Sequence, residues 1–143
     1  HAYLEGFNVE LMANSDNVLR GGLTPKHIDV PELLKHVKCE ATIPAIIKGK
    51  AGEEGEINYA TPAPDFRLSL FELKAGETVS FTPESVEIIL LTDGVAELDD
   101  DENLVKLQLG NPSAVVFPGQ MVYLAAATDC TVFRAREGIH NRE

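Results

Sequence analysis

Basic residues are scarce in this sequence. Lysine and arginine together number 12 against 23 acidic residues, so the formal net charge at pH 7 is -11. Binding to nucleic acid or to an anionic membrane surface requires clustered Lys and Arg that neutralise phosphates. The charge balance therefore argues against nucleic acid and anionic membranes as partners.

Long hydrophobic runs are missing and cysteines are few. No stretch of about eighteen apolar residues occurs, so we expect no membrane span, and no signal peptide is visible. The two cysteines, Cys39 and Cys130, lie far apart in the sequence and fit no metal-binding spacing. They favour reduced thiols over a disulfide, which predicts a cytoplasmic protein.

The residues that are present suit one globular domain of ordinary size, with 44% hydrophobic and 24% charged residues among 143. Three regions follow one another along the chain. Residues 1–27 are polar, residues 28–64 contain a short helix and a loose connector, and residues 65–143 are mostly strands. The connector over 48–65 is rich in Gly, Glu and Pro, which predicts a surface segment.

One helix is predicted over residues 28–38, which read IDVPELLKHVK. Asp29 is a suitable N-cap and Pro31 suits the first turn. Leu33, Leu34 and Val37 form an apolar stripe on one face.

The last region predicts an antiparallel β fold. Short strand-like segments recur at regular spacing between turn signals such as TDG, GNP and PGQ, a pattern typical of a sandwich or jelly roll. The segments are DFRLSLFEL, ETVSFTP, SVEIILLT, VAEL, LVKLQL, SAVVFP, MVYLAA and CTVFRAR. We therefore predict a mainly β protein, a jelly-roll sandwich or barrel with one short helix.

The first eleven residues predict a hairpin that turns at Glu5-Gly6, since Gly can supply a positive φ. Paired positions then share a face, and one face is apolar. The other face carries His1, Tyr3, Asn8 and Glu10. Two interpretations stay open: a cluster of donors, acceptors and metal ligands, or a sheet with one face in water.

The following segment adds charged residues beside two adjacent glycines. Asp16, Arg20 and Lys26 flank Gly21-Gly22, and glycines permit unusual backbone angles or close approach of a ligand. The planar fork of arginine suits phosphate or a developing oxyanion. A surface loop with ordinary ion pairs is the alternative.

The sequence motifs in this part of the chain resemble those of a known family. HAYLEG, Glu10, SDN, RGGLTPK and DVPELL stand in the order and spacing of the type I mannose-6-phosphate isomerases. The resemblance is strong over about the first forty residues, and the remainder resembles the C-terminal jelly roll of that family more loosely. It implies a cupin-like fold and a zinc-dependent interconversion of mannose 6-phosphate and fructose 6-phosphate.

The resemblance also implies roles for individual residues. The family binds zinc through a Gln-x-His pair, a Glu and the His of the HAYL motif, which corresponds to His1. The other ligands have no counterpart here and are expected upstream, so that residues 1–27 end a catalytic cupin domain. Arg20 would stabilise charge in the transition state and Glu10 would be an acid/base group. The remaining residues placed in the substrate pocket are Tyr3, Asp16 and Lys26.

Residues 65–143 are predicted to lack a metal site of their own. In a cupin motif counted from Gly76, the histidine positions hold Thr82 and Glu84, and Glu87 stands where the glutamate would be. The acidic run over 99–103 lacks the glycine and spacing of an EF-hand calcium loop, which favours a solvated hairpin loop.

Two functions of different classes therefore stay open. The chain is either the C-terminal part of the isomerase, with a phosphorylated hexose as substrate and a monomeric state, or a stand-alone jelly-roll domain for binding or assembly. Specificity for mannose is implied by the resemblance and not by the chemistry of any individual residue.

Overall fold

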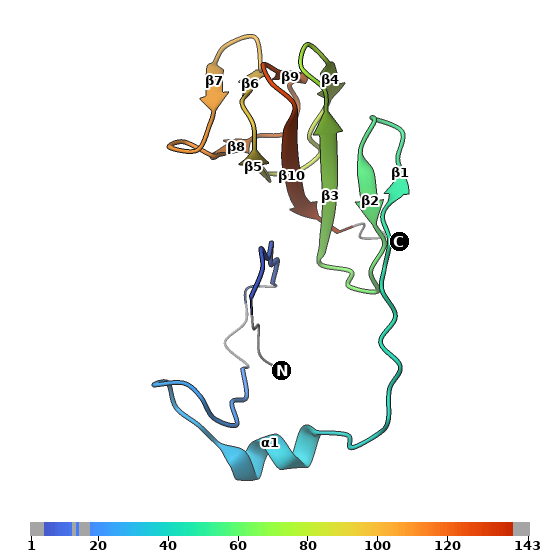
Figure 1. The fold of residues 1–143 in the computed structure, drawn as a ribbon, viewed down its shortest axis with the longest axis vertical. Coiled ribbons are helices and arrows are strands. Elements are labelled where there is room, and N and C mark those ends of the chain that lie inside the picture. The colour runs from blue at the N-terminus through green and yellow to red at the C-terminus, as the bar shows by residue number, and fades with distance from the viewer. Residues whose placement is uncertain (1–4, 13, 15–17, 139–143) are drawn as a thin grey trace. The chain divides into compact units, whose positions relative to one another are not determined.

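The structure is a computed structural model that describes residues 5–12, 14 and 18–138. These residues fall into two compact units, which are treated separately. The smaller comprises Met12–Ile46 and contains helix α1, Val30–His36, whereas the larger contains the strands (Figure 1). No helix among the described residues is long and apolar enough to cross a membrane.

Helix α1 begins as its sequence predicts. The Asp29 carboxylate accepts a hydrogen bond from the backbone N–H of Glu32 at 2.9 Å, and Pro31 lies in the first turn. Lys35 in the last turn pairs with Glu32. The predicted apolar stripe, however, is not buried: no residue of α1 is buried, and Leu34 is 65% exposed. Capping therefore defines this helix more than packing does.

Two antiparallel sheets form the larger unit. The six-stranded sheet has the order β1-β2-β3-β10-β5-β8 and the four-stranded sheet has the order β4-β9-β6-β7. The strands of the first sheet are β1 Lys50–Ala51, β2 Ile57–Tyr59, β3 Phe66–Leu73, β5 Glu87–Asp93, β8 Ser113–Val116 and β10 Cys130–Glu137. Those of the second are β4 Thr78–Phe81, β6 Ala96–Asp99, β7 Leu104–Leu107 and β9 Val122–Ala126.

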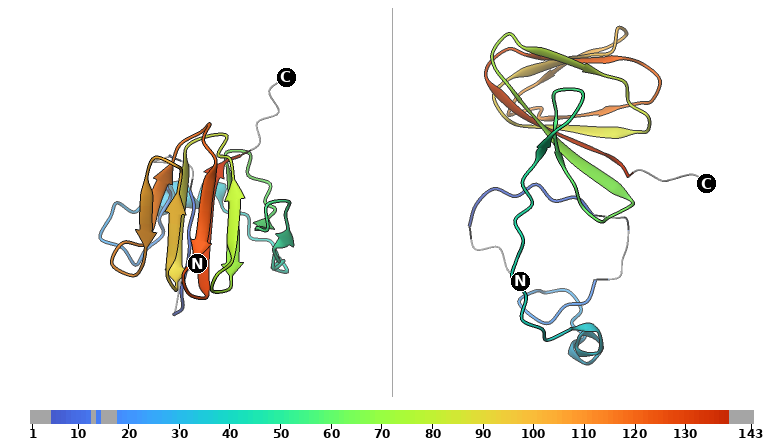
Figure 2. Two further views of the ribbon diagram at one scale, coloured as in Figure 1. Left: turned by 90° about the horizontal axis from the view of Figure 1, so that it is seen from above. Right: turned by 90° about the vertical axis from the view of Figure 1, so that its right-hand side faces the viewer.

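The strand order confirms the predicted jelly-roll fold. From β3 onward, consecutive strands alternate between the two sheets except at β6–β7, which form a hairpin within one sheet. The two sheets face each other across a shared core and are not closed into a barrel (Figure 2). All eight strand segments predicted from the sequence correspond to strands β3–β10.

The connector is more ordered than predicted. Residues 48–65 were expected to be a loose surface segment, yet they contain β1 and β2, and β2 pairs with β3. Glu56, just before β2, is only 5% exposed. The Gly- and Glu-rich composition that indicates a loop here encodes the turn of a hairpin, because Gly55 adopts a positive φ of 78° between the two short strands.

The apolar core lies between the two sheets. Phe71, Ile89 and Val132 of the six-stranded sheet face Leu107 and Leu124 of the four-stranded sheet, and all five are fully buried. The alternation of buried and exposed residues along β5, β6 and β9 places one face of each strand in this core. Burial of these side chains is the main stabilising contribution to the sandwich.

Two further predictions concern loops. The acidic run closes the β6–β7 hairpin, where the Asp100 carboxylate accepts from the backbone N–H of Asn103 at 2.7 Å, as expected of a solvated hairpin loop. At the start of the chain, Gly6 has the positive φ expected of the turn, but residues 7–12 form no strand. The predicted partner strand, residues 1–4, lies outside the described residues.

Replacing two glycines by alanine distinguishes the free-energy cost of backbone strain from that of a steric clash. Gly76 and Gly94 have nearly the same positive φ, 86° and 84°, but a Cβ at Gly94 would lie 2.1 Å from the carbonyl oxygen of Asp129, whereas nothing lies within 4 Å at Gly76. We expect Gly76→Ala to lower the free energy of unfolding by about 1–2 kcal/mol and Gly94→Ala to lower it substantially further. Equal losses in urea denaturation would contradict the close approach at Gly94.

Candidate functional site

The residues predicted to form a site are only partly described. His1, Tyr3 and Asp16 lie outside the described residues. Glu10 is exposed and belongs to the larger unit, whereas Arg20 and Lys26 belong to the smaller unit. Neither unit by itself brings these three residues together.

Arg20 and Lys26 lie in the loop that precedes α1. The Arg20 side chain is half-buried and makes one hydrogen bond among the described residues, to the carbonyl oxygen of Val18 at 3.5 Å. A Cβ at Gly21 would meet a methyl group of Leu33 at 3.0 Å, so the loop lies close against the helix. The Lys26 side chain is exposed, and its backbone N–H donates to Thr24.

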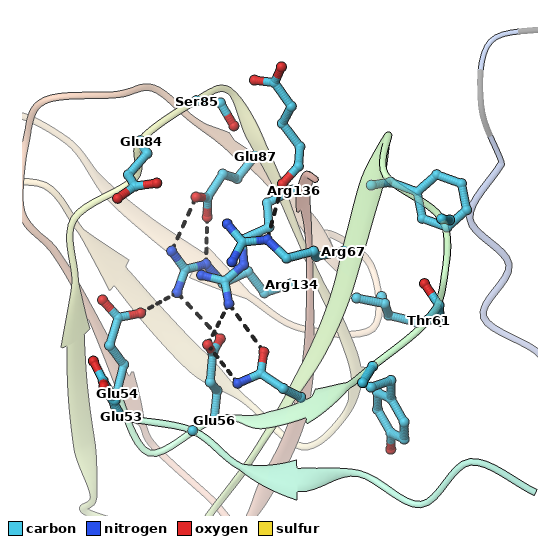
Figure 3. A pocket seen from close by; sticks show the side chains of 18 of the residues that line it. Glu53, Glu54, Glu56, Thr61, Arg67, Glu84, Ser85, Glu87, Arg134 and Arg136 are labelled. Atoms are coloured by element: carbon cyan, nitrogen blue, oxygen red, sulfur yellow. Dashed lines mark hydrogen bonds and ion pairs between the residues drawn. The ribbon is translucent and has the colours of Figure 1, made fainter. Parts of the chain in front are cut away.

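The larger unit contains a polar cleft that the sequence did not predict. It has a volume of about 980 Å³. It is lined by residues of the β1–β2 turn, the β2–β3 and β4–β5 loops, and strands β2, β3, β5 and β10. Figure 3 shows the guanidinium groups of Arg67, Arg134 and Arg136 gathered in this cleft, with glutamates around them. On β10, the charged face thus continues the buried apolar face of the same strand.

Arg134 is the central residue of the cleft and is 1% exposed. It donates through two nitrogens to both carboxylate oxygens of Glu87, at 2.5 and 3.1 Å, and through a third to Glu54 at 2.6 Å. Its guanidinium also lies over the ring of Phe81, 4.0 Å from the centroid. Burial disfavours the charge on Arg134, but hydrogen bonds to Glu87 and Glu54 outweigh burial and raise its pKa.

Glu56 forms the second part of the network. Its carboxylate accepts from the Ser69 hydroxyl at 2.8 Å, from the Asn58 amide at 3.1 Å and from Arg136 at 2.5 Å. Burial raises the pKa of Glu56, but the bond from Ser69 and the charge of Arg136 outweigh burial, so the pKa lies below its ordinary 4.5. Glu56 is therefore an ion-pair partner rather than a proton donor at neutral pH.

The cleft occupies the positions of the degenerate cupin motif. Thr82, Glu84 and Glu87 all line it, although the sequence gives them no histidine neighbours. The Glu87 carboxylate forms an ion pair with the guanidinium of Arg134. No group of three His, Cys, Asp or Glu side chains among the described residues is arranged to hold a metal ion.

A weak signal of this cleft exists in the sequence. Arg134 and Arg136 alternate with Ala135 in a strand whose earlier positions on the same face, Cys130 and Val132, are buried and apolar. Two arginines that continue an inward face require acidic partners. The partners Glu54 and Glu56 stand about eighty residues earlier, and no local pattern links the two segments.

Comparisons with known proteins identify relatives over most of the chain. No protein-family model matches. The mannose-6-phosphate isomerase of Salmonella typhimurium is 42% identical over 117 residues, 80% of this chain and 29% of that protein. The Escherichia coli enzyme is 39% identical over 88% of this chain and 30% of that protein. This chain is similar to the C-terminal part of the mannose-6-phosphate isomerases.

Other comparisons agree. The human mannose-6-phosphate isomerase is 33% identical over 94% of this chain and 34% of its own length. The apo crystal structure of the Salmonella typhimurium isomerase matches with a TM-score of 0.69 and 32% identity, over 90% of this chain and 32% of that one. The chain thus spans about a third of the length of the mannose-6-phosphate isomerases that it matches.

The buried ion pair predicts a large effect of removing its cation. Arg134→Met leaves the buried Glu87 carboxylate without a counter-charge, and we expect the free energy of unfolding to fall by about 3–5 kcal/mol. The double variant Arg134→Met with Glu87→Leu should recover most of this loss. Lys74→Met, which removes an exposed ion pair with Asp129 at 2.9 Å, is the control and should change little. If urea denaturation gave similarly small losses of unfolding free energy for Arg134→Met and Lys74→Met, the central role of Arg134 would be refuted.

The lowered pKa of Glu56 predicts a pH dependence of stability. A carboxyl with a lower pKa in the folded state contributes stability that is complete above its unfolded pKa, near 4.5, and is lost as the pH falls through the folded value. Glu56→Gln should therefore lower stability at pH 7 but reduce its decline below pH 4.5. Glu97→Gln, at an exposed position of β6, is the control, and chemical denaturation over a pH series is the measurement. Equal acid-side slopes for the Glu56→Gln variant and the original chain would contradict the assignment.

Proposed function

We propose that this chain is the C-terminal part of a zinc-dependent isomerase that interconverts mannose 6-phosphate and fructose 6-phosphate. The supporting observation is the sequence identity between this chain and mannose-6-phosphate isomerases, which extends over most of the chain. The reaction moves a proton between C1 and C2 of the sugar through a cis-enediolate. It therefore needs an acid/base group and a cation that stabilises the developing negative charge.

Glu10 and Arg20 are proposed for these two tasks. The exposed Glu10 carboxylate can move the proton. Arg20 uses only one of its donors within the described residues, on Val18, so its remaining N–H groups can bind the enediolate or the phosphate. The exposed ammonium group of Lys26 suits the phosphate. Tyr3 and Asp16 are proposed as further residues of the substrate pocket.

Zinc is proposed as the cofactor, with His1 as one ligand. A bound zinc ion polarises sugar oxygens, but a catalytic zinc site needs about three protein ligands. The described residues gather no such set, and the resemblance assigns the other ligands to residues that this sequence does not include. We therefore derive no step through the metal from the residues present.

The second candidate is a binding domain without catalytic activity. The larger unit has its own hydrophobic core and its own polar cleft, features that a binding domain requires. Isomerase activity in a protein that contains this chain at the length of its relatives would favour the first candidate. Ligand binding without such activity would favour the second.

Replacement of Arg20 tests the catalytic proposal. In a chain of the relatives' length, Arg20→Ala should reduce turnover of mannose 6-phosphate about a hundredfold or more, the usual scale for loss of a charge-stabilising donor. The melting temperature should change little, because among the described residues Arg20 makes only one long hydrogen bond. A coupled assay measures the turnover.

Lys38→Ala, at an exposed position after the helix in the same unit, is the control and should leave turnover unchanged. We expect the 143-residue chain alone to show no turnover even with added zinc. Full activity of Arg20→Ala with a much lower melting temperature would make Arg20 a structural residue. If the 143-residue chain turned over substrate nearly as fast as the longer protein, the assignment of the other zinc ligands to residues upstream of this sequence would be wrong.

A further inference from the structure

Two arginines lie directly opposite each other in the cleft. Arg67 on β3 and Arg136 on β10 are Cα partners in the antiparallel pairing of these strands, and both line the cleft. Like charges at directly opposed positions destabilise a sheet. Burial lowers the pKa of Arg67, and the charge of Arg136 lowers it further. The fold therefore keeps two guanidinium groups together at an energetic cost.

Within the part of the chain that the structure describes, these two arginines have N–H donors without an acceptor. The Arg136 side chain is only 10% exposed, and its Nε is buried. This Nε has no hydrogen-bond partner among the described residues. The bonds of Arg136 run through one terminal nitrogen, to Glu56 and Asn58. Among residues 5–12, 14 and 18–138, Arg67 donates one hydrogen bond, from its Nε to the carbonyl oxygen of Glu137 at 3.2 Å. A buried donor without an acceptor costs free energy unless a water or a ligand supplies one.

Arg134 provides the contrast. It is also buried in this cleft, but its three nitrogens bond to Glu87, Glu54 and Glu56. Arg134 therefore has a structural role, whereas the pair formed by Arg67 and Arg136 has donors left for another molecule.

We propose that Arg67 and Arg136 bind an oxyanion, a carboxylate or a phosphate group, of a small hydroxyl-bearing molecule. Guanidinium groups bind such oxyanions through paired N–H donors. The hydroxyls of that molecule would donate to the neighbouring carboxylates, of which Glu84 and Glu54 are partly or fully exposed. The volume of about 980 Å³ lies at the upper end of the range for small-molecule sites.

The charge around the pair limits which anions can bind. Six glutamates and three arginines line the cleft, so a polyanion would be repelled at the rim. A single oxyanion group can reach the two guanidiniums while the rest of the molecule stays uncharged. The charge arrangement of the cleft therefore favours binding of hydroxylated acids or monophosphate esters over binding of nucleic acid.

The proposal is tested by titrating the 143-residue chain with gluconate, inorganic phosphate and mannose. Binding is followed by calorimetry and by the Nε–H resonances of Arg67 and Arg136 in NMR spectra. We expect gluconate or phosphate to shift both resonances and neutral mannose to bind at least about tenfold more weakly, since it lacks the charge-assisted bonds. Binding of phosphate alone would identify a phosphate ester as the ligand, and binding of gluconate alone would identify a carboxylic acid.

Variants provide the decisive comparison. Arg67→Gln should weaken anion binding at least about tenfold, and Arg67→Lys should weaken it less, because it keeps the charge but loses the planar fork. Lys106→Gln, at an exposed position of β7 in the other sheet, makes the same charge change and should have no effect.

Two outcomes would overturn the proposal: no shift of either resonance with any anion, or equal anion binding by Arg67→Gln and the original chain. The measurement involves only binding to the jelly roll, so its failure leaves the isomerase proposal untouched. Loss of isomerase activity would in turn leave this binding unchanged.

Discussion

The buried guanidinium of Arg134 is the interaction on which the polar end of the sandwich depends. It connects its own strand β10 to Glu87 on β5 and to Glu54 in the β1–β2 turn, and its flat face covers Phe81 of the opposite sheet. One side chain thus links its own strand to three other parts of the fold. A buried charge is tolerated only where hydrogen bonds and counter-charges replace water, so the glutamates around Arg134 are requirements of its burial.

The same strands form both the apolar core and the charged cleft. Along β10, Cys130 and Val132 face the core, and Arg134 and Arg136 continue on the same face into the cleft. Along β5, Ile89 faces the core and Glu87 the cleft. The apolar core and, beyond it, the contact of Arg134 with Phe81 therefore both link the two sheets.

Much of the fold could be predicted from the sequence, and less of the site. The strands β3–β10 and the cap at Asp29 follow from local signals, namely alternation, turn residues and a side chain that caps a helix. The strands β1 and β2 could not be predicted, because two and three residues are too few to show a period. The cleft could not be predicted either, since Arg134 meets its partners only after the sheets have formed.

The place of β10 also constrains how this fold can be reached. β10 is the last of the described strands along the chain, yet it lies between β3 and β5 inside the six-stranded sheet. Its Arg134 meets Glu54 and Glu56 across 80 and 78 residues, and such distant pairings make folding slow. On the ribosome, β3 and β5 must therefore wait without their common neighbour until β10 has been synthesised. During that interval the open edges of β3 and β5 can pair with strands of other chains.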